Sequence, residues 1–268
     1  MRMLARTAWL LATASAAPLT AQMTGTQPPP PVLVISRELV KPGKSAAHNQ
    51  WEAKWPAAFA KAKFATNYIG MNPASGINEA WYLFGFASFD AMEKENARMD
   101  ADSALSAEQG PLYAGEADFV ESTRAVIAAY VPSVSYKPNV DLSKMRYFEV
   151  LTYAMKPGHA GDFIKAAGIV RDGFTKAGID QPWAIYRAVS GVPAGTFYVF
   201  LPMRALAALD KGPANDDAMR RALGPEQMSA LDKLVLDGVA TSQSQIFAFN
   251  PKMSFVSKEM KAADPFWR

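Results

Sequence analysis

The chain contains one strand–turn–helix pattern twice, about 115 residues apart. Lys41-Pro42-Gly43 follows an apolar stretch, and Lys156-Pro157-Gly158 follows another with similar surroundings. Aligning these tripeptides without gaps also places residues 59–62 on residues 174–177, with Phe, Lys and Ala matching. Two units of roughly 110 residues follow from this spacing, and each is expected to build a similar structure.

The first copy, "VKPGKS" from Val40 to Ser45, has the Gly-Lys-Ser ending of a phosphate-binding loop. Such a loop also needs a glycine five residues before that ending, where backbone amides surround the phosphates, and Glu38 occupies this position. The nucleotide-binding interpretation therefore fails. Because proline fixes φ and glycine allows an open joint, Lys-Pro-Gly is predicted to end the first strand and start the helix of each unit.

Strand and helix patterns recur in the same order in both units. Residues 32–40 and 146–155 are β-branched and aromatic, which predicts first strands. One apolar helix face in the second unit is formed by Phe163, Ala166, Ala167, Val170, Phe174 and Ala177. Trp51, Trp55, Phe59 and Ala62 match it in the first unit, where Pro56 should interrupt the helix.

The rest of each unit is predicted as two strands, polar helices and a last strand. The paired strands are expected at 67–73 with 78–88 and at 183–189 with 196–203. Helices are expected to include residues 116–130 and 225–240, and the last strands lie near 132–137 and 244–250. This β-α-β-β-α-β order predicts an α+β protein of two ferredoxin-like units in tandem.

The predicted segments divide the chain into five parts. Residues 1–21 have two arginines, a short apolar run and small residues before Ala21, which predicts a cleavable signal peptide. A membrane anchor is the alternative, but the run is shorter than the roughly 20 residues that span a bilayer. The remaining parts are a Pro-rich linker at 22–31, units at 32–139 and 140–251, and a C-terminal tail at 252–268.

Composition limits the compartment and the chemistry. The formal charge of +3, from 28 basic and 25 acidic residues, gives no reason to expect a nucleic-acid partner. The sequence has no cysteine, which excludes disulfides, thiolate metal sites and a cysteine nucleophile. With the signal peptide, this predicts a periplasmic or secreted protein that is not stably inserted in a membrane.

The alternation of side chains along the strands predicts which of them face a second sheet. Tyr82, Phe84 and Phe86, aligned with Phe197, Val199 and Leu201, are expected to lie under the helices, with Leu33, Ile35, Phe148 and Val150. The space between the two sheets is then lined by Trp81, Leu83, Tyr198, Phe200, Ser36, Glu38, Glu149, Leu151 and Tyr153. A partly polar, aromatic space of this kind suits a small ligand.

The candidate site residues come from this inward-facing set. Glu38, Glu149 and Tyr153 are the catalytic candidates, because burial shifts carboxyl pKa values toward neutrality and a tyrosine can donate a hydrogen bond. Trp81, Tyr198, Phe200 and His48 are the ligand-binding candidates. The alternative is structural: the two glutamates would pair with Arg37, Arg146 or Arg187, and the tyrosines would be core residues.

His48 and His159 are the only histidines, so any haem or imidazole chemistry must use one of them. His48 is predicted on the inner face of its helix, and His159 is predicted in solvent at the start of its helix. Neither has acidic residues clustered around it in the sequence, so no metal site is predicted.

The strand–turn–helix "EVLTYAMKPGHAGDFIKAA" resembles the opening of dimeric α+β barrel proteins, as does "SGINEAWYLFGFASFDAMEK". The resemblance is to the NIPSNAP-like and antibiotic-biosynthesis-monooxygenase-like groups, and it spans roughly residues 32–251. It implies a barrel formed by two chains or two fused units, with a pocket on its inner surface. Members include cofactor-free oxygenases, isomerases and haem-binding enzymes. No motif places His159 where fused barrels of the chlorite-dismutase type hold haem.

Three functions remain open from the sequence. The first is binding of a small apolar or aromatic molecule between the sheets, with or without a cofactor-independent monooxygenase or isomerase reaction. The second is haem binding through His48 or His159. The third is a non-enzymatic periplasmic interaction or stress module with a filled barrel. No other cofactor is expected, and a homodimer is compatible with all three.

Overall fold

The computed structural model describes residues 27–268, so the predicted signal peptide and the first part of the linker lie outside the described residues. Eight strands form a closed barrel in the order β1-β3-β2-β8-β5-β7-β6-β4. The strands are β1 (Val32–Val40), β2 (Tyr68–Pro73), β3 (Glu79–Phe86), β4 (Val120–Tyr130), β5 (Tyr147–Met155), β6 (Ala184–Ser190), β7 (Thr196–Met203) and β8 (Val239–Phe249). An α+β barrel is therefore confirmed.

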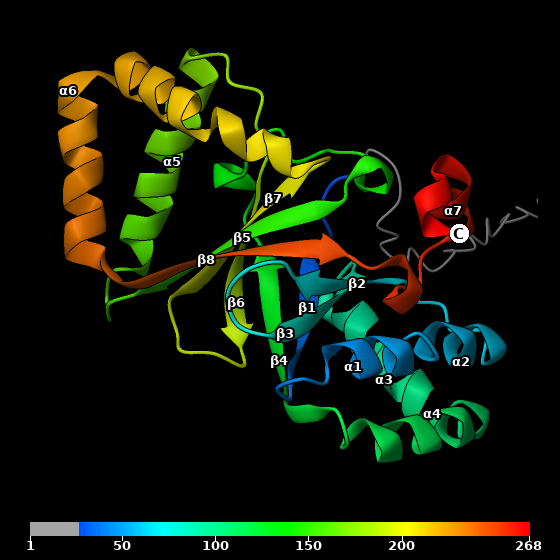
Figure 1. Cartoon of the computed structure of the whole chain (residues 1–268). Coiled ribbons are helices and arrows are strands. Elements are labelled where there is room, and N and C mark those ends of the chain that lie inside the picture. The colour runs from blue at the N-terminus through cyan, green and yellow to red at the C-terminus, as the bar shows by residue number, and fades with distance from the viewer. Residues whose placement is uncertain (1–26) are drawn as a thin grey trace, which may run out of the picture.

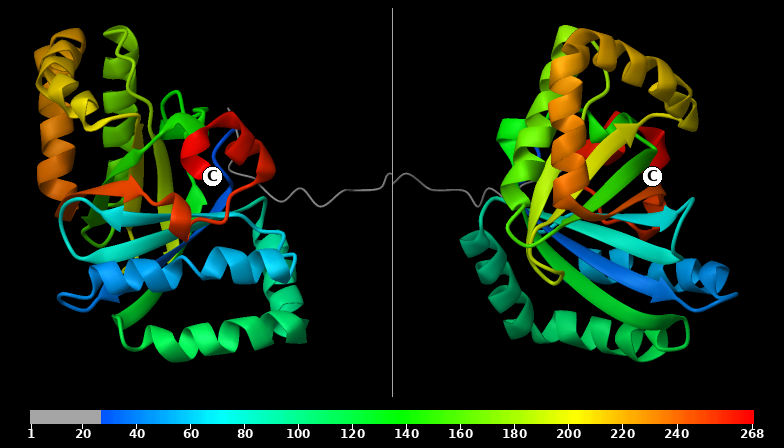
Figure 2. Two further views of the ribbon diagram at one scale, coloured as in Figure 1. Left: turned by 45° about the vertical axis from the view of Figure 1, so that its right-hand side comes forward. Right: turned by 90° about the vertical axis from the view of Figure 1, so that its left-hand side faces the viewer.

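Helices cover the outside of the barrel in two separate groups (Figures 1 and 2). The first half contributes α1 (Ser45–Glu52), α2 (Trp55–Lys61), α3 (Phe89–Ala101) and α4 (Ser103–Glu116). The second half contributes α5 (Ala160–Lys176) and α6 (Gly212–Gly238). Within the described residues, no helix is both long enough and apolar enough to cross a membrane.

The two halves of the barrel have the same internal strand order. In the first half β4 pairs with β1, β1 with β3, and β3 with β2, and the second half repeats this as β8, β5, β7 and β6. Every pair is antiparallel, and the barrel closes where β2 meets β8 and where β4 meets β6. The predicted first strands and the predicted break at Pro56 are confirmed, because Pro56 lies in the first turn of α2.

Two predicted elements of the first unit are wrong, namely the helix at 116–130 and the last strand near 132–137. Residues 120–130 form strand β4, although their alanine content suggested a helix, and the segment expected as the last strand contains the short 3₁₀ helix Pro132–Val134. Arg124, Val126 and Ala128 lie on one face of β4, and the strand pairs with β1 on one side and β6 on the other. Pairing on two edges outweighs the helix propensity of alanine.

Segments at both ends of the chain pack on the barrel. Pro30, in the predicted linker, is buried at one end of the barrel. The predicted C-terminal tail contains α7 (Lys258–Ala263) and folds back, so that Trp267 is buried beside Phe249. These contacts extend the core beyond the eight strands.

Candidate functional site

A cavity of about 640 Å³ lies on the outer face of the second half, between the barrel and helices α5 and α6. Figure 1 shows the two helices standing away from strands β5 and β7 on the left of the molecule. The cavity walls are mostly apolar and come from β5, α5, β6, β7 and α6. Concave, apolar spaces of this size with a few polar groups are typical of small-molecule sites.

Strand alternation and helix periodicity explain the apolar lining. The outer face of β7 presents Val199 and Leu201 to the cavity, whereas Tyr198 and Phe200 point into the barrel. From α5, the predicted apolar face supplies Phe163, Ala166, Ala167, Val170 and Phe174. The two alanines leave room that larger side chains would fill.

Helix α6 forms the roof because it is bent. Gly224 has φ 74° and ψ 172°, a conformation open almost only to glycine, and Pro225 follows it. The bend separates two helical legs, and both legs contribute to the cavity through Met219 and Leu231. Gly173 of α5 allows the first leg to approach, since a Cβ there would lie 2.7 Å from Cγ of Met219.

The cavity wall also carries polar and charged side chains, which include Asp162, Asp180, Lys211 and Asp216 as well as two residues of β5. Glu149 accepts a hydrogen bond from Ser244 Oγ at 2.9 Å, and Tyr153 lies on the same face of β5. Burial, followed by the charge of Glu149, raises the pKa of the Tyr153 phenol, which keeps its proton. Two of the three catalytic candidates thus line one cavity, although not the space predicted for them.

The residues around the cavity do not fit haem held by histidine. No histidine is among the described residues that line it. His159 lies at the start of α5, where its Nδ1 is 2.8 Å from Asp162 Oδ2. A haem iron in a protein needs an axial donor such as histidine, methionine, cysteine or tyrosine, and here only methionine and tyrosine side chains are available.

The barrel interior is filled by side chains. Trp81, Tyr198 and Phe200 point into it as predicted, and each is almost fully buried. The Trp81 ring lies 4.6 Å from Phe247 and 6.1 Å from Tyr198 between ring centroids. These three ligand-binding candidates are therefore core residues in this structure.

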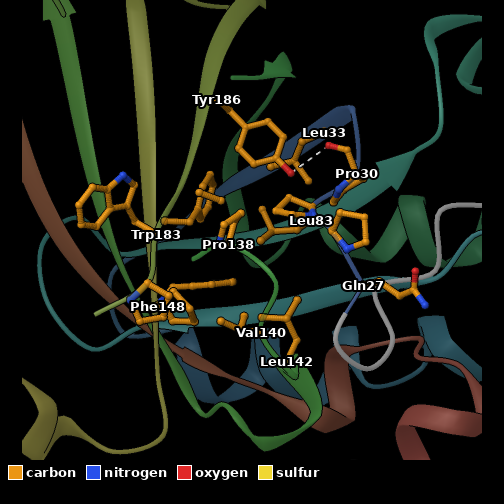
Figure 3. Close-up of a pocket in the computed structure, with 16 residues that line it drawn as sticks. Gln27, Pro30, Leu33, Leu83, Pro138, Val140, Leu142, Phe148, Trp183 and Tyr186 are labelled. Carbon is orange, nitrogen blue, oxygen red and sulfur yellow. Dashed lines mark hydrogen bonds between the residues drawn. The ribbon is translucent and has the colours of Figure 1, made fainter. Parts of the chain in front are cut away.

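A small pocket of about 60 Å³ remains at one end of the barrel. Figure 3 shows Tyr186 pointing toward Pro30, whose carbonyl oxygen accepts a hydrogen bond from the tyrosine hydroxyl at 3.0 Å. Leu33, Leu83 and Phe148 form the floor beneath the proline-rich segment. The segment closes this end and leaves little room for a ligand.

The opposite part of the barrel interior holds an ion cluster that the sequence did not predict. Glu79, fully buried, accepts a hydrogen bond from Arg37 Nε at 2.9 Å and pairs with Arg124. Trp81 Nε1 also donates to Glu79 at 3.2 Å. Burial raises the pKa of Glu79, but the hydrogen bonds and charge of the arginines outweigh it, and the net pKa is lowered.

The predicted facing of β1 and β5 is wrong. Leu33, Ile35, Phe148 and Val150 point into the barrel, and the residues expected there lie on the helix side, namely Glu38, Glu149, Leu151 and Tyr153. Strand β1 has side chains suited to burial on both faces, so its alternation alone does not identify the inner one. The expected arginine pairs also differ, because Arg37 binds Glu79 and Arg146 binds Asp264.

Glu38, the remaining catalytic candidate, belongs to a buried cluster under the helices of the first half. Its Oε2 lies 2.8 Å from Nε2 of His48, and Glu52 joins them one turn further along α1. Relative exposures are 7% for Glu38, 1% for His48 and 3% for Glu52. The fold therefore places two acidic side chains beside His48, a proximity that residue spacing in the sequence did not predict.

This cluster contains more acidic side chains than basic ones. Burial, followed by the charge of Glu38, raises the pKa of Glu52 to about 8. The same two causes raise the pKa of Glu116, from the end of α4, to about 7. Nδ1 of His48, Oε1 of Glu52 and the hydroxyl of Tyr82 are buried without a hydrogen-bond partner among the described residues. The Tyr82 hydroxyl lies near the Glu52 carboxyl and lowers the pKa of Glu52, although the contact does not have standard hydrogen-bond geometry.

A signal for this cluster was present in the sequence. His48 and Glu52 are four residues apart, so a helix places them on one face. Glu38 and Val40 share a face of the first strand, and Val40 packs beneath the helices. A correct prediction of which face of β1 lies under the helices would have placed Glu38 beside His48.

Comparison with solved structures identifies the architecture. A protein from Fusobacterium nucleatum, provisionally named a monooxygenase, matches with a TM-score of 0.52 and 9% identity over 82% of this chain and 93% of that one. An anthrone oxidase-like protein matches with a TM-score of 0.52 and 10% identity over 82% and 91%. A mutant chlorite dismutase from Candidatus Nitrospira defluvii matches with a TM-score of 0.50 and 7% identity over 83% and 93%.

These similarities establish the α+β barrel fold and nothing finer, because the identities are so low. Searches of protein-family models and of curated protein sequences found no match.

Proposed function

We propose that this protein binds a small, largely apolar or aromatic molecule in the cavity beneath α5 and α6. The observation that carries the proposal is a largely apolar space of about 640 Å³ lined by β5, β6, β7, α5 and α6. The filled barrel interior supports this location over the space between the sheets. The family resemblance in the sequence and the similar folds agree with a small-molecule protein.

Glu149 and Tyr153 are the groups that would orient or transform the molecule. The carboxylate of Glu149 can accept a proton or a hydrogen bond, and the protonated phenol of Tyr153 can donate one to a carbonyl oxygen. A monooxygenase-like or isomerase-like reaction on an aromatic carbonyl compound would use this pair. The supporting contact is their shared face on β5 beside the apolar wall.

Anthrone is a suitable first probe, since it is flat, apolar and carries one carbonyl group. Isothermal titration calorimetry with the purified protein is expected to give one binding site. Ala167→Phe, which fills the cavity from α5, should abolish binding. Ala114→Phe makes the same change on the exposed side of α4 and should leave binding unchanged.

Native mass spectrometry of gently purified protein tests the same cavity for a retained ligand. An added organic mass that is absent from the Ala167→Phe variant supports the proposal. A haem mass with a Soret absorption band that survives in the variant but not in His159→Ala would replace it with haem binding. A bare protein that binds no apolar probe would favour the interaction module.

We propose further that the protein acts outside the cytoplasm, on the evidence of residues 1–21, and that its halves are duplicated ferredoxin-like units of the NIPSNAP-like or monooxygenase-like type. The repeated Lys-Pro-Gly turns and the repeated strand order support the duplication. N-terminal sequencing of protein recovered from the periplasm should begin near residue 22.

A further inference from the structure

We propose that Glu38, His48 and Glu52 form a binding site for a divalent transition-metal ion, with Zn²⁺ as the reference cation. The site lies in the first half of the molecule, between β1 and α1, and is separate from the cavity under α5 and α6. It is therefore independent of the proposed ligand function.

The geometry supplies three donors from three side chains. One ring nitrogen of His48 and one carboxylate oxygen each of Glu38 and Glu52 lie within 4.8 Å of one another. Donor atoms around a tetrahedral zinc ion are about 3.3 Å apart, given bond lengths of about 2.0–2.2 Å. Small side-chain movements would therefore bring the three atoms to coordination distance.

Unpartnered buried atoms are the second observation. A polar atom removed from water costs free energy unless something binds it, and most buried polar groups have a partner. Here His48 Nδ1, Glu52 Oε1 and the Tyr82 hydroxyl have none within the described part of the chain, and all belong to one cluster. A cation would satisfy the carboxylate oxygen directly and offset the excess acid of Glu38, Glu52 and Glu116.

The donor set indicates the class of metal. One imidazole nitrogen with two carboxylates suits Zn²⁺, Mn²⁺ or Fe²⁺, whereas Ca²⁺ and Mg²⁺ favour oxygen donors alone. Glu116, partly buried at the end of α4, is near enough for the charges of Glu38 and His48 to affect its pKa, but it is not one of the three donors.

The test uses untagged protein, because a histidine tag would bind the same metals. After chelator treatment and dialysis, Zn²⁺ is titrated at pH 7.5 by calorimetry, and Co²⁺ is titrated with detection of its visible absorption. We expect one equivalent of metal with a Kd below about 10 µM. Failure of wild-type protein to bind either ion in this range would overturn the proposal.

His48→Asn should abolish the one-equivalent binding and the Co²⁺ bands. His159→Asn is the matched control at the other histidine, which is partly exposed beside Asp162, and should bind as wild type does. The reverse pattern would assign the metal to the surface pair and reject the buried site.

Glu52→Gln keeps the proposal testable if His48→Asn does not fold. The glutamine has the shape and neutral charge of the protonated glutamic acid, so circular dichroism should show an intact fold. Zn²⁺ affinity should fall at least about tenfold, because an amide oxygen is a weaker donor than a carboxylate. Unchanged affinity in a folded Glu52→Gln variant would remove Glu52 from the site and contradict the three-residue assignment.

Discussion

At the scale of single residues, the barrel interior and the layer between β1 and α1 bury charge in different ways. Glu79 lies between two arginines, so its carboxylate is compensated inside the barrel. Glu52 lies near Glu38 with no basic side chain but His48 in the cluster. The first arrangement favours the ionised acid and the second favours the protonated one, which predicts opposite responses to pH.

Raising the pH should destabilise the metal-free protein through Glu52. Its pKa rises from an ordinary value of 4.5 to about 8 in the folded state, so the folded protein retains a proton that the unfolded chain releases. The free energy of unfolding is therefore unaffected below pH 4.5 and falls as the pH rises toward 8, by up to about 1.4 kcal/mol per pH unit. Urea denaturation with chelator from pH 5 to 8.5 measures this slope.

In the Glu52→Gln variant, the free energy of unfolding should fall less steeply with pH over that range. The slope that remains comes from Glu116, whose pKa is also raised. Glu93→Gln, on the exposed surface of α3, controls for the change in net charge. Identical slopes for wild type and Glu52→Gln would contradict the burial of an uncompensated acid.

Removal of the Glu79 side chain should lower the free energy of unfolding much more than removal of the Arg124 side chain. Glu79→Ala leaves Arg37 in the barrel without its acid, and the loss of one partner of a buried ion pair costs about 3–5 kcal/mol. Arg124 is 55% exposed, so solvent screens it and Arg124→Ala should cost less than about 1 kcal/mol. Thermal and urea denaturation of the two variants compare these values, and equal losses would contradict the assignment.

At the scale of elements, strand ends were easier to predict than strand faces. β1 and β7 begin and end at the predicted residues, because both are β-branched and aromatic runs that begin directly after a proline or glycine, Pro31 and Gly195. The inner face of β1 was not predictable from the sequence. Arg37 and Glu38 are neighbours that point to opposite faces of the strand, and each forms an ion pair inside the protein. β4 was missed because its alternation is weak and its stability comes from the strands on either side.

The cavity could not be predicted from the sequence either. Its helix face on α5 was predicted correctly, but the roof depends on the direction that α6 takes after Gly224. That direction is a property of one backbone conformation rather than of a side-chain pattern.

Gly224→Ala should therefore lower both stability and ligand affinity. A Cβ at this glycine would meet no neighbouring atom within 4 Å, so the cost is that of the backbone conformation, about 1–3 kcal/mol. Gly168→Ala adds the same methyl group inside α5, again with no atom within 4 Å, and should be neutral or stabilising. Denaturation and probe titration of both variants test this, and equal behaviour would rule out strain at the bend.

At the scale of the whole molecule, the barrel depends on both halves. Each half has two edge strands, and the free edge of each pairs with the other half, at β2–β8 and at β4–β6. A half produced alone would expose both edges and the apolar faces that now fill the barrel.

Residues 140–268 expressed alone should therefore form dimers or larger species, because a second copy can cover the exposed edges. Light scattering after size-exclusion chromatography measures the mass, and addition of residues 27–139 should convert the material to a one-to-one complex. A stable, folded monomer of residues 140–268 would show that the halves are independent domains.

Closure of the barrel also sets the order of events during synthesis. β1 to β4 leave the ribosome well before β6 and β8 exist, so two strand edges and the future interior stay exposed while the second half is translated. The first half must pass this interval without associating with other nascent chains. Translation speed and chaperone supply should therefore influence the yield of this protein more than they would for a barrel closed within each half.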